Sequence, residues 1–189
     1  MTLSNPFNKS ELKSAIQDLK QNLANSFQAI DEKTFFQKPE KGWSPAENIQ
    51  HMNRVTKVLG LTYVTPKFIA SFIFGETNHK SKTMNEMATI YLDALRQGKD
   101  SGFFAAKTEK TDINTTKRKE ELIRDWNSEW EKYKTAIDGW SEEDLDKILM
   151  PHPFLGKITA REMYMVGILH PVHHASIVAN RLGVNWNYF

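Results

Sequence analysis

The chain has 189 residues, of which 40% are hydrophobic and 25% are charged, with 25 basic against 23 acidic side chains. This composition is typical of a globular protein and excludes a largely disordered or collagen-like chain. The chain contains no cysteine, which excludes disulfides, a cysteine nucleophile, thiolate zinc ligands and iron–sulfur clusters. A formal net charge of +2 does not indicate a nucleic-acid-binding protein, and we expect one domain over residues 1–189.

Helical spacing dominates the first third of the sequence. Apolar residues recur at intervals of three, four and seven between residues 9 and 31, which predicts an amphipathic helix. The segment Ser44–Glu47 has the pattern of a capping box with proline at the first helical position. It predicts a second helix that continues to about Tyr63, and Pro66 ends or kinks that helix.

The most apolar stretch of the chain is Val58–Phe74, which contains Pro66 and Lys67. It falls short of the ~20 residues that cross a bilayer, so we expect a buried helical segment rather than a membrane span. The N-terminal residues 1–7 lack the basic start and apolar run of a signal peptide. We therefore expect a cytoplasmic protein without a membrane partner.

The middle of the chain contains one short and one long helical pattern. A second capping box, Thr83–Glu86, predicts a short helix up to Gly98, and the polar residues 98–114 are expected to form a loop. A third long helix is predicted from about Thr116 to Gly139, with tryptophans and aliphatic residues on its buried face. The segment Ser141–Asp144 predicts a further short helical start.

The C-terminal pattern completes a set of four long amphipathic helices. A turn is expected at Pro151–Gly156, and a capping box at Thr159–Glu162 opens a helix that should end at Gly183. Four such helices predict an all-α four-helix bundle with one or two short extra helices. The long connection between the second and third long helices allows a crossover.

Three histidines can converge in such a bundle. His170 and His174 are four residues apart, so both lie on one face of the last predicted helix. His51 lies two turns inside the second helix, at a similar depth if the two helices are antiparallel. Three imidazoles from two helices can bind one divalent ion and leave positions for water or substrate. Zinc, nickel and iron all accept such ligands.

The neighbouring residues leave alternatives open. His173 is either a flanking group or a hydrogen-bond donor to a metal-ligating side chain. The angle around the helix axis between His170 and His173 is wider than the angle between His170 and His174. Glu47 could orient His51 or a water molecule, although capping is a sufficient role for it. Pro171 either kinks the helix beside His170 or is simply tolerated. The histidines could also be structural, because a pair at this spacing is common by chance.

Two blocks of sequence carry a family resemblance. The segment Trp43–Met52 contains W-S-x-x-E-x-x-x-H and resembles the opening motif of the DinB/YfiT-like metalloenzymes. The segment Pro153–Thr159, followed by Glu162 and by H-x-x-H-H at His170–His174, is similar to the closing block of that family. Residues 76–114 carry no family motif.

The resemblance implies a four-helix bundle with an up-down-down-up path. It also implies that His51, His170 and His174 bind nickel, zinc or a similar ion. Characterised relatives include thiol-dependent S-transferases and isomerases that use bacillithiol or mycothiol, many members have no known activity, and dimers are common. We therefore expect a homodimer with a small-molecule substrate and one divalent ion (nickel, zinc or iron).

Two functions follow from these expectations. The first is a metal-dependent transferase or hydrolase-like enzyme that uses a low-molecular-weight thiol, or water, against a small electrophile. The alternative is a non-catalytic dimeric bundle with a structural or vestigial metal site and a stress or interaction role. A sealed, dry cavity at the histidines would favour the alternative, and an open pocket would favour the enzyme.

Overall fold

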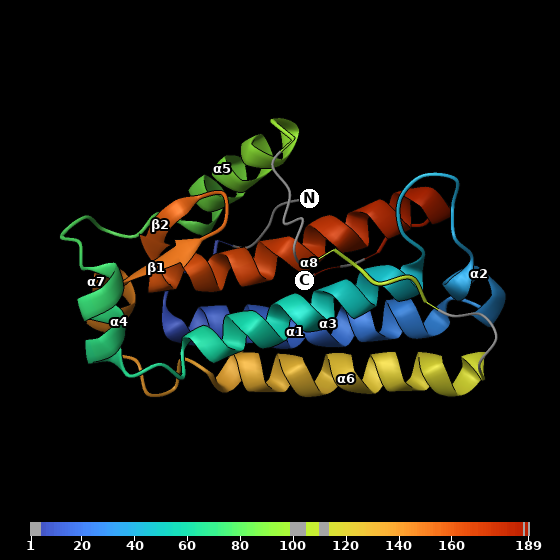
Figure 1. Ribbon diagram of the computed structural model, residues 1–189, viewed down its shortest axis with the longest axis horizontal. Coiled ribbons are helices and arrows are strands. Elements are labelled where there is room, and N and C mark those ends of the chain that lie inside the picture. Colours follow the sequence, from blue (N-terminus) through green and yellow to red (C-terminus); the bar gives the residue numbers. More distant parts are fainter. Residues whose placement is uncertain (1–4, 99–104, 110–113, 187, 189) are drawn as a thin grey trace.

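Helices make up most of the computed structural model, which describes residues 5–98, 105–109, 114–186 and 188 (Figure 1). Within these ranges the elements, in chain order, are α1 (Lys9–Ala29), α2 (Glu32–Phe36), α3 (Pro45–Thr62), α4 (Lys67–Phe74), α5 (Met84–Arg96), α6 (Thr115–Thr135), α7 (Glu142–Lys147), β1 (Leu149–His152), β2 (Gly156–Thr159) and α8 (Ala160–Leu182).

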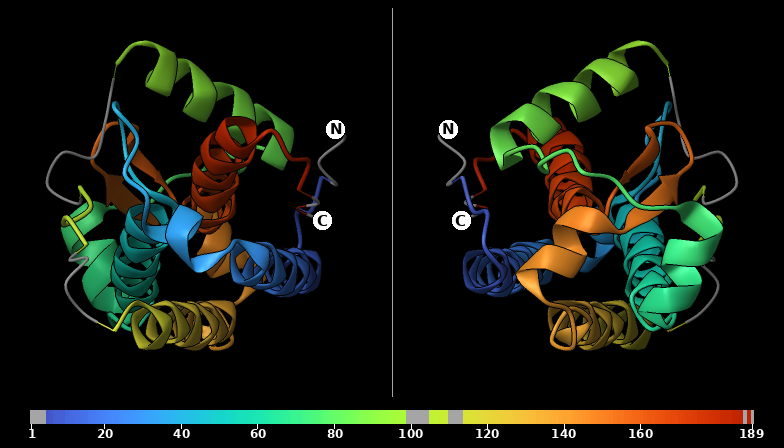
Figure 2. Two further views of the ribbon diagram at one scale, coloured as in Figure 1. Left: turned by 90° about the vertical axis from the view of Figure 1, so that its right-hand side faces the viewer. Right: turned by 90° about the vertical axis from the view of Figure 1, so that its left-hand side faces the viewer.

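The four long helices, α1, α3, α6 and α8, form the predicted four-helix bundle. Figure 1 shows that α1 and α8 run in one direction, whereas α3 and α6 run in the other, which is the up-down-down-up path. The end views in Figure 2 place α6 and α8 at opposite corners, and each of them packs against both α1 and α3. The antiparallel packing of α3 and α8 is the arrangement that the histidine site requires.

Local capping explains where the helices begin. The Ser44 hydroxyl accepts from the Glu47 amide at 3.1 Å, and the Glu47 carboxylate accepts from the Ser44 amide at 2.9 Å. The same reciprocal pair forms at Thr83–Glu86, Ser141–Asp144 and Thr159–Glu162. Each pair satisfies two amides that the helix itself leaves unbonded, so the predicted starts of α3, α5, α7 and α8 are confirmed.

Helix α8 continues through Pro171 and ends where predicted. The residue after it, Gly183, has φ 67°, a left-handed conformation that favours glycine. Pro171, for which the sequence left a kink beside His170 and simple tolerance open, lies inside one continuous helix. The lost amide hydrogen bond does not end the helix because the first half of α8, residues 160–171, is buried and held by its neighbours.

Two small elements were not predicted. The segment expected as a turn, Pro151–Gly156, belongs to an antiparallel hairpin in which Leu149 pairs with Thr159 and His152 with Gly156. Strands of four residues are too short to show a clear alternation, and Pro151 is unusual within a strand. Helix α2 is a single turn with no periodic signal of its own. Parts of the loop expected at residues 98–114 lie outside the described residues.

The prediction that Val58–Phe74 is buried is wrong. Helix α3 ends at Thr62, and α4 is bent by 97° from it after Pro66. Helix α4 therefore crosses the end of the bundle, where Ala70 is its buried residue and Phe72 is 90% exposed. No single helix within the described ranges is long and apolar enough to cross a membrane, and α3 with α4 meets that test only as this bent pair.

The core of the bundle contains a close approach between α6 and α8. Trp126 and Trp130 are fully buried, as predicted. The ring of Tyr133 reaches across the core to α8, where its hydroxyl donates to the Tyr164 carbonyl at 3.1 Å. A Cβ at Gly167 would lie 2.5 Å from Cζ of Tyr133. Glycine is therefore required there because the aromatic ring occupies the space of a side chain.

Candidate metal centre

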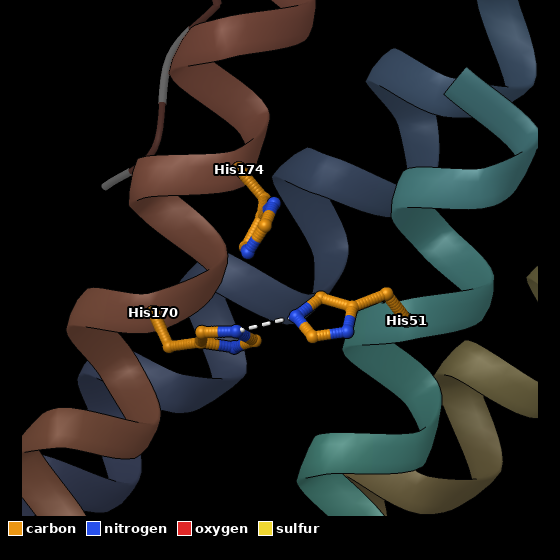
Figure 3. Close-up of side chains that lie close together, drawn as sticks. All are labelled: His51, His170 and His174. Carbon is orange, nitrogen blue, oxygen red and sulfur yellow. Dashed lines mark hydrogen bonds between the residues drawn. The ribbon is translucent and has the colours of Figure 1, made fainter. Parts of the chain in front are cut away.

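Three imidazoles meet between α3 and α8. His51 projects from α3, and His170 and His174 project from successive turns of α8 toward it (Figure 3). The Nε2 atoms of His51 and His170 are 3.0 Å apart, and one nitrogen from each of the three rings lies within 4.8 Å of the others. The sequence prediction that these three residues converge is thus correct in geometry.

Burial keeps the rings of His170 and His174 uncharged. His51 is 1% exposed and His170 is 8% exposed, whereas His174 is partly exposed. Burial lowers the pKa of His170 well below its ordinary value, and the neighbouring His174 and His51 lower it further. Burial and the His51 ring likewise lower the pKa of His174. Neutral imidazoles with available lone pairs are the form that binds a metal ion.

Asn48 orients His174. The Asn48 side-chain amide donates to the carbonyls of Trp43 and Ser44, at 3.2 and 2.9 Å, so its oxygen faces Nδ1 of His174 at 3.1 Å. An amide oxygen only accepts hydrogen bonds, so His174 carries its proton on Nδ1 and its lone pair on Nε2. We did not single out Asn48 from the sequence, although its position three residues before His51 places it on the same face of α3.

Trp43 closes one side of the three histidines. Its ring stacks on the His174 ring, with centroids 5.7 Å apart and planes inclined by 7°. The centroids of the Trp43 and His51 rings are 4.9 Å apart. The Arg181 guanidinium donates to the carbonyls of Lys41 and Trp43, at 3.2 and 2.6 Å, which ties this loop to the end of α8. Trp43 therefore forms a wall of the site.

The two residues predicted to support the ligands have other contacts. The Glu47 carboxylate caps α3 and lies 3.5 Å from the Lys38 ammonium. The His173 ring contacts the rings of His174 and Tyr91, with centroids 5.2 and 6.5 Å apart. These contacts place Glu47 at the helix start and His173 beside the site, and the supporting role of either residue stays a prediction.

A pocket of about 310 Å³ adjoins the three imidazoles. It lies between α3, α5, α8 and the hairpin, and the exposed Val58 contributes to its lining. Its described lining is Trp43, His51, Val55, Val58, Leu59, Thr62, Tyr91, Leu95, Pro151, His152, Pro153, Phe154, Met163, Val166, His170, His173 and His174. The pocket thus combines apolar walls with a few polar groups, as ligand sites do.

Helix α5 is one wall of this pocket, through Tyr91 and Leu95. The segment that leads into α5 is anchored on the start of α8, because the buried Glu162 carboxylate accepts from the amide and the ammonium of Lys82 at 2.9 and 3.1 Å. The Ser81 and Thr159 hydroxyls are also hydrogen-bonded, at 2.7 Å. The sequence left the role of this region open, and the structure makes α5 part of the site.

His152, which we also did not single out from the sequence, lies on the pocket wall formed by the hairpin. Its Nδ1 atom accepts from the backbone amides of Leu155 and Phe154, at 3.2 and 3.4 Å. Burial lowers the pKa of His152 to about 4. Its position in a turn between two prolines gave no helical spacing from which a role could be inferred.

The donor set fits a small divalent ion. Zinc–nitrogen bonds of about 2.0–2.1 Å place two ligands of a tetrahedral ion about 3.4 Å apart. The separations here, 3.0 Å for one pair and none above 4.8 Å, bracket that distance. Nickel and iron(II) also accept neutral imidazole, so the donor chemistry suits the three metals that the sequence suggested.

The fold and the site define a helical-bundle protein with a candidate three-histidine metal centre. A family model described as the DinB superfamily matches residues 15–178, and the chain therefore belongs to that superfamily. The resemblance found in the sequence is confirmed. Among curated proteins, none matches this chain at a significant level.

Replacing Asn48 with alanine should weaken metal binding without abolishing it. His174 would lose the acceptor that fixes its proton on Nδ1, and loss of such an orienting partner costs roughly 10–100-fold in metal affinity. Competitive titration with a chelating dye measures the change. Asn53→Ala is a matched control, since Asn53 is a buried asparagine of the same helix that donates to Leu122. Equal losses in both variants would contradict the role of Asn48.

His152 should stay neutral far into the acidic range. Its pKa is about 4 in the folded protein against an ordinary value of 6.5, so between these values only the unfolded chain binds the proton. The contribution of His152 to stability is therefore complete above pH 6.5 and is lost as the pH falls toward 4. An NMR titration of the ring tests this, and a midpoint near pH 6.5 would contradict it.

Proposed function

We propose that His51, His170 and His174 hold one divalent ion, such as nickel, zinc or iron(II), and that the protein transfers a low-molecular-weight thiol to a small electrophile. The observation that carries this proposal is the position of the three imidazoles at the wall of a pocket of about 310 Å³. An open pocket gives a second molecule access to the ion, as in catalytic zinc sites that keep a position free.

The ion would supply Lewis-acid chemistry that lowers the pKa of a thiol or of water. The protein's own residues present three neutral ring nitrogens and exclude bulk water with apolar walls such as Leu59 and Val166. The sulfur must come from a second molecule, because the chain contains no cysteine. In the transfer, sulfur bonds to the electrophilic carbon, the leaving group departs with its bonding pair, and the thiol proton passes to solvent.

The charge of the site also favours an anionic nucleophile. Three neutral imidazoles leave the charge of a divalent ion uncompensated, and the described residues that line the pocket include no carboxylate. An ion with uncompensated charge is strongly destabilised in apolar surroundings. A thiolate, or a hydroxide in the hydrolytic form of the reaction, would offset part of that charge.

The proposal is tested by metal content and turnover measured on the same preparation. The purified protein is loaded with nickel, zinc or iron(II) and mixed with cysteine, glutathione or bacillithiol and 1-chloro-2,4-dinitrobenzene, and thioether formation is followed by absorbance. We expect turnover that depends on the ion and is lost in His51→Ala. Stoichiometric metal with no turnover for any pair would favour the non-catalytic bundle instead, and a folded protein that holds no metal would contradict the transferase.

The remaining expectations accompany this proposal as predictions. They are a homodimer, a cytoplasmic location, a small-molecule substrate, and the absence of nucleic-acid and membrane partners. Sedimentation analysis of the purified protein would test the oligomeric state directly.

A further inference from the structure

Apart from an ion held by the three imidazoles, the pocket beside the histidines offers no charged partner to a ligand. Its described lining includes neither lysine, arginine, aspartate nor glutamate, and aliphatic and aromatic side chains such as Val55, Leu95 and Phe154 predominate. A charged group that enters such a pocket loses its hydration without gaining an ion pair. The lining therefore favours a ligand that is uncharged and largely apolar.

The hydrogen bonds of His152 fix which of its nitrogens carries the proton. Backbone amides can only donate, so the Nδ1 atom that accepts from Leu155 and Phe154 must present a lone pair. A neutral imidazole with its lone pair on Nδ1 carries its hydrogen on Nε2. The turn of the hairpin thus makes His152 an N–H donor, whichever ligand is present.

The Nε2 donor of His152 is available to a ligand. Within the described residues no acceptor lies within hydrogen-bond distance of it, and the buried side-chain atoms that lack a partner there are Asn53 Oδ1 and Trp130 Nε1. The ring of His152 is half-buried and lines the pocket. His152 and the three imidazoles line the same pocket. A ligand bound to His152 would consequently lie close to the three imidazoles.

The other polar side chains of the pocket do not have a role as hydrogen-bond donor to a ligand that the fold fixes. The Tyr91 hydroxyl can donate or accept, and the Thr62 hydroxyl already donates to the Leu59 carbonyl at 2.7 Å. Among the residues that the structure describes, no hydrogen bond fixes the proton of His173. Among these groups His152 is the one whose role as a donor is set by the fold itself.

We propose that this pocket binds an uncharged, largely apolar small molecule with one hydrogen-bond acceptor, such as a carbonyl compound that also carries the leaving group of the transfer, and that the Nε2–H group of His152 orients it. His152 is then a specificity-determining residue. As a statement about the electrophile, this inference rests on the proposed thiol transfer, whereas the binding itself can be measured without any turnover.

Ligand selectivity tests the proposal through two pairs of similar shape. Dissociation constants are measured by NMR on the full-length protein for acetophenone against isopropylbenzene, and for tert-butylbenzene against the phenyltrimethylammonium cation. We expect acetophenone to bind roughly three- to tenfold more tightly than isopropylbenzene, which is the gain from one neutral hydrogen bond. We expect the cation to bind more weakly than its neutral counterpart. Equal affinities within either pair would overturn the proposal.

Two further measurements assign the effect to His152. In His152→Asn the side-chain oxygen can still accept from the turn amides, but no donor remains at the position of Nε2, so the preference for acetophenone should disappear. The exposed His79→Asn should keep that preference. Long-range proton–nitrogen spectra of the wild type should show His152 protonated on Nε2, and protonation on Nδ1 would overturn the assignment without any substitution.

The outcomes separate this inference from the proposed function. A protein that binds metal and transfers thiols, but shows no preference for the acceptor, would contradict only the role of His152. A protein that shows the preference but holds no metal would contradict only the thiol transferase.

Discussion

Replacing His174 with alanine should abolish specific metal binding while leaving the fold intact. The substitution removes one of three nitrogens that lie within 4.8 Å of one another, so only two imidazole ligands remain for the ion. The affinity should fall by more than the roughly 10–100-fold that loss of an orienting partner costs. His174 is half-buried and lies outside the hydrophobic core, so its truncation should cost less stability than that of a core side chain. Metal analysis after gel filtration measures the loss, and circular dichroism checks the fold.

Two matched histidine variants show whether the loss is specific. His173 is adjacent on the same helix but faces Tyr91 as well as His174, so His173→Ala should keep the metal. His79 is exposed and is not one of the three converging histidines, and His79→Ala should behave like the wild type. Retention of stoichiometric metal in His174→Ala, or its loss in His79→Ala, would contradict the assignment.

Gly167→Ala should produce a large loss of stability. The new Cβ would lie 2.5 and 2.7 Å from Cζ and Cε1 of Tyr133, a rigid ring that is completely buried. Such overpacking costs about 3 kcal/mol, and alanine recovers about 1 kcal/mol through its higher helix propensity. A net loss of about 2 kcal/mol lowers the melting temperature of a chain of this size by about 4–8 °C.

Gly139→Ala is the matched control for this clash. Nothing lies within 4 Å of a Cβ at Gly139, so the free energy of unfolding should change by less than about 0.5 kcal/mol. The double variant Gly167→Ala with Tyr133→Phe should recover part of the loss, because the hydroxyl and its steric demand are removed together. Equal stability of the two glycine variants would show that the approach of Tyr133 to α8 is looser than described.

The parts of the fold that sequence predicts well are those with a local physical cause. The start of α3 was predictable because Ser44 and Glu47 satisfy each other's backbone amides three residues apart. The pair His170 and His174 was predictable because a spacing of four places both rings on one helix face. The depth of His51 within its helix then sufficed to match it with this pair across antiparallel helices.

The parts that sequence misses depend on contacts between distant segments. The direction of α4 after Pro66 is set by packing at the end of the bundle, so the exposure of Phe72 had no local signal. Asn48 matters through a contact with His174, which lies 126 residues away. His152 matters through a hairpin of two four-residue strands that places it against the pocket.

The most direct test of the metal centre is a crystal structure of the protein equilibrated with nickel, with anomalous diffraction recorded at the nickel edge. We expect one dominant peak, with ring nitrogens of His51, His170 and His174 at about 2.0–2.2 Å from it, a distance typical of imidazole ligands. A stoichiometric complex whose only peak lies away from these three rings, or a fully folded protein with no peak, would contradict the central claim.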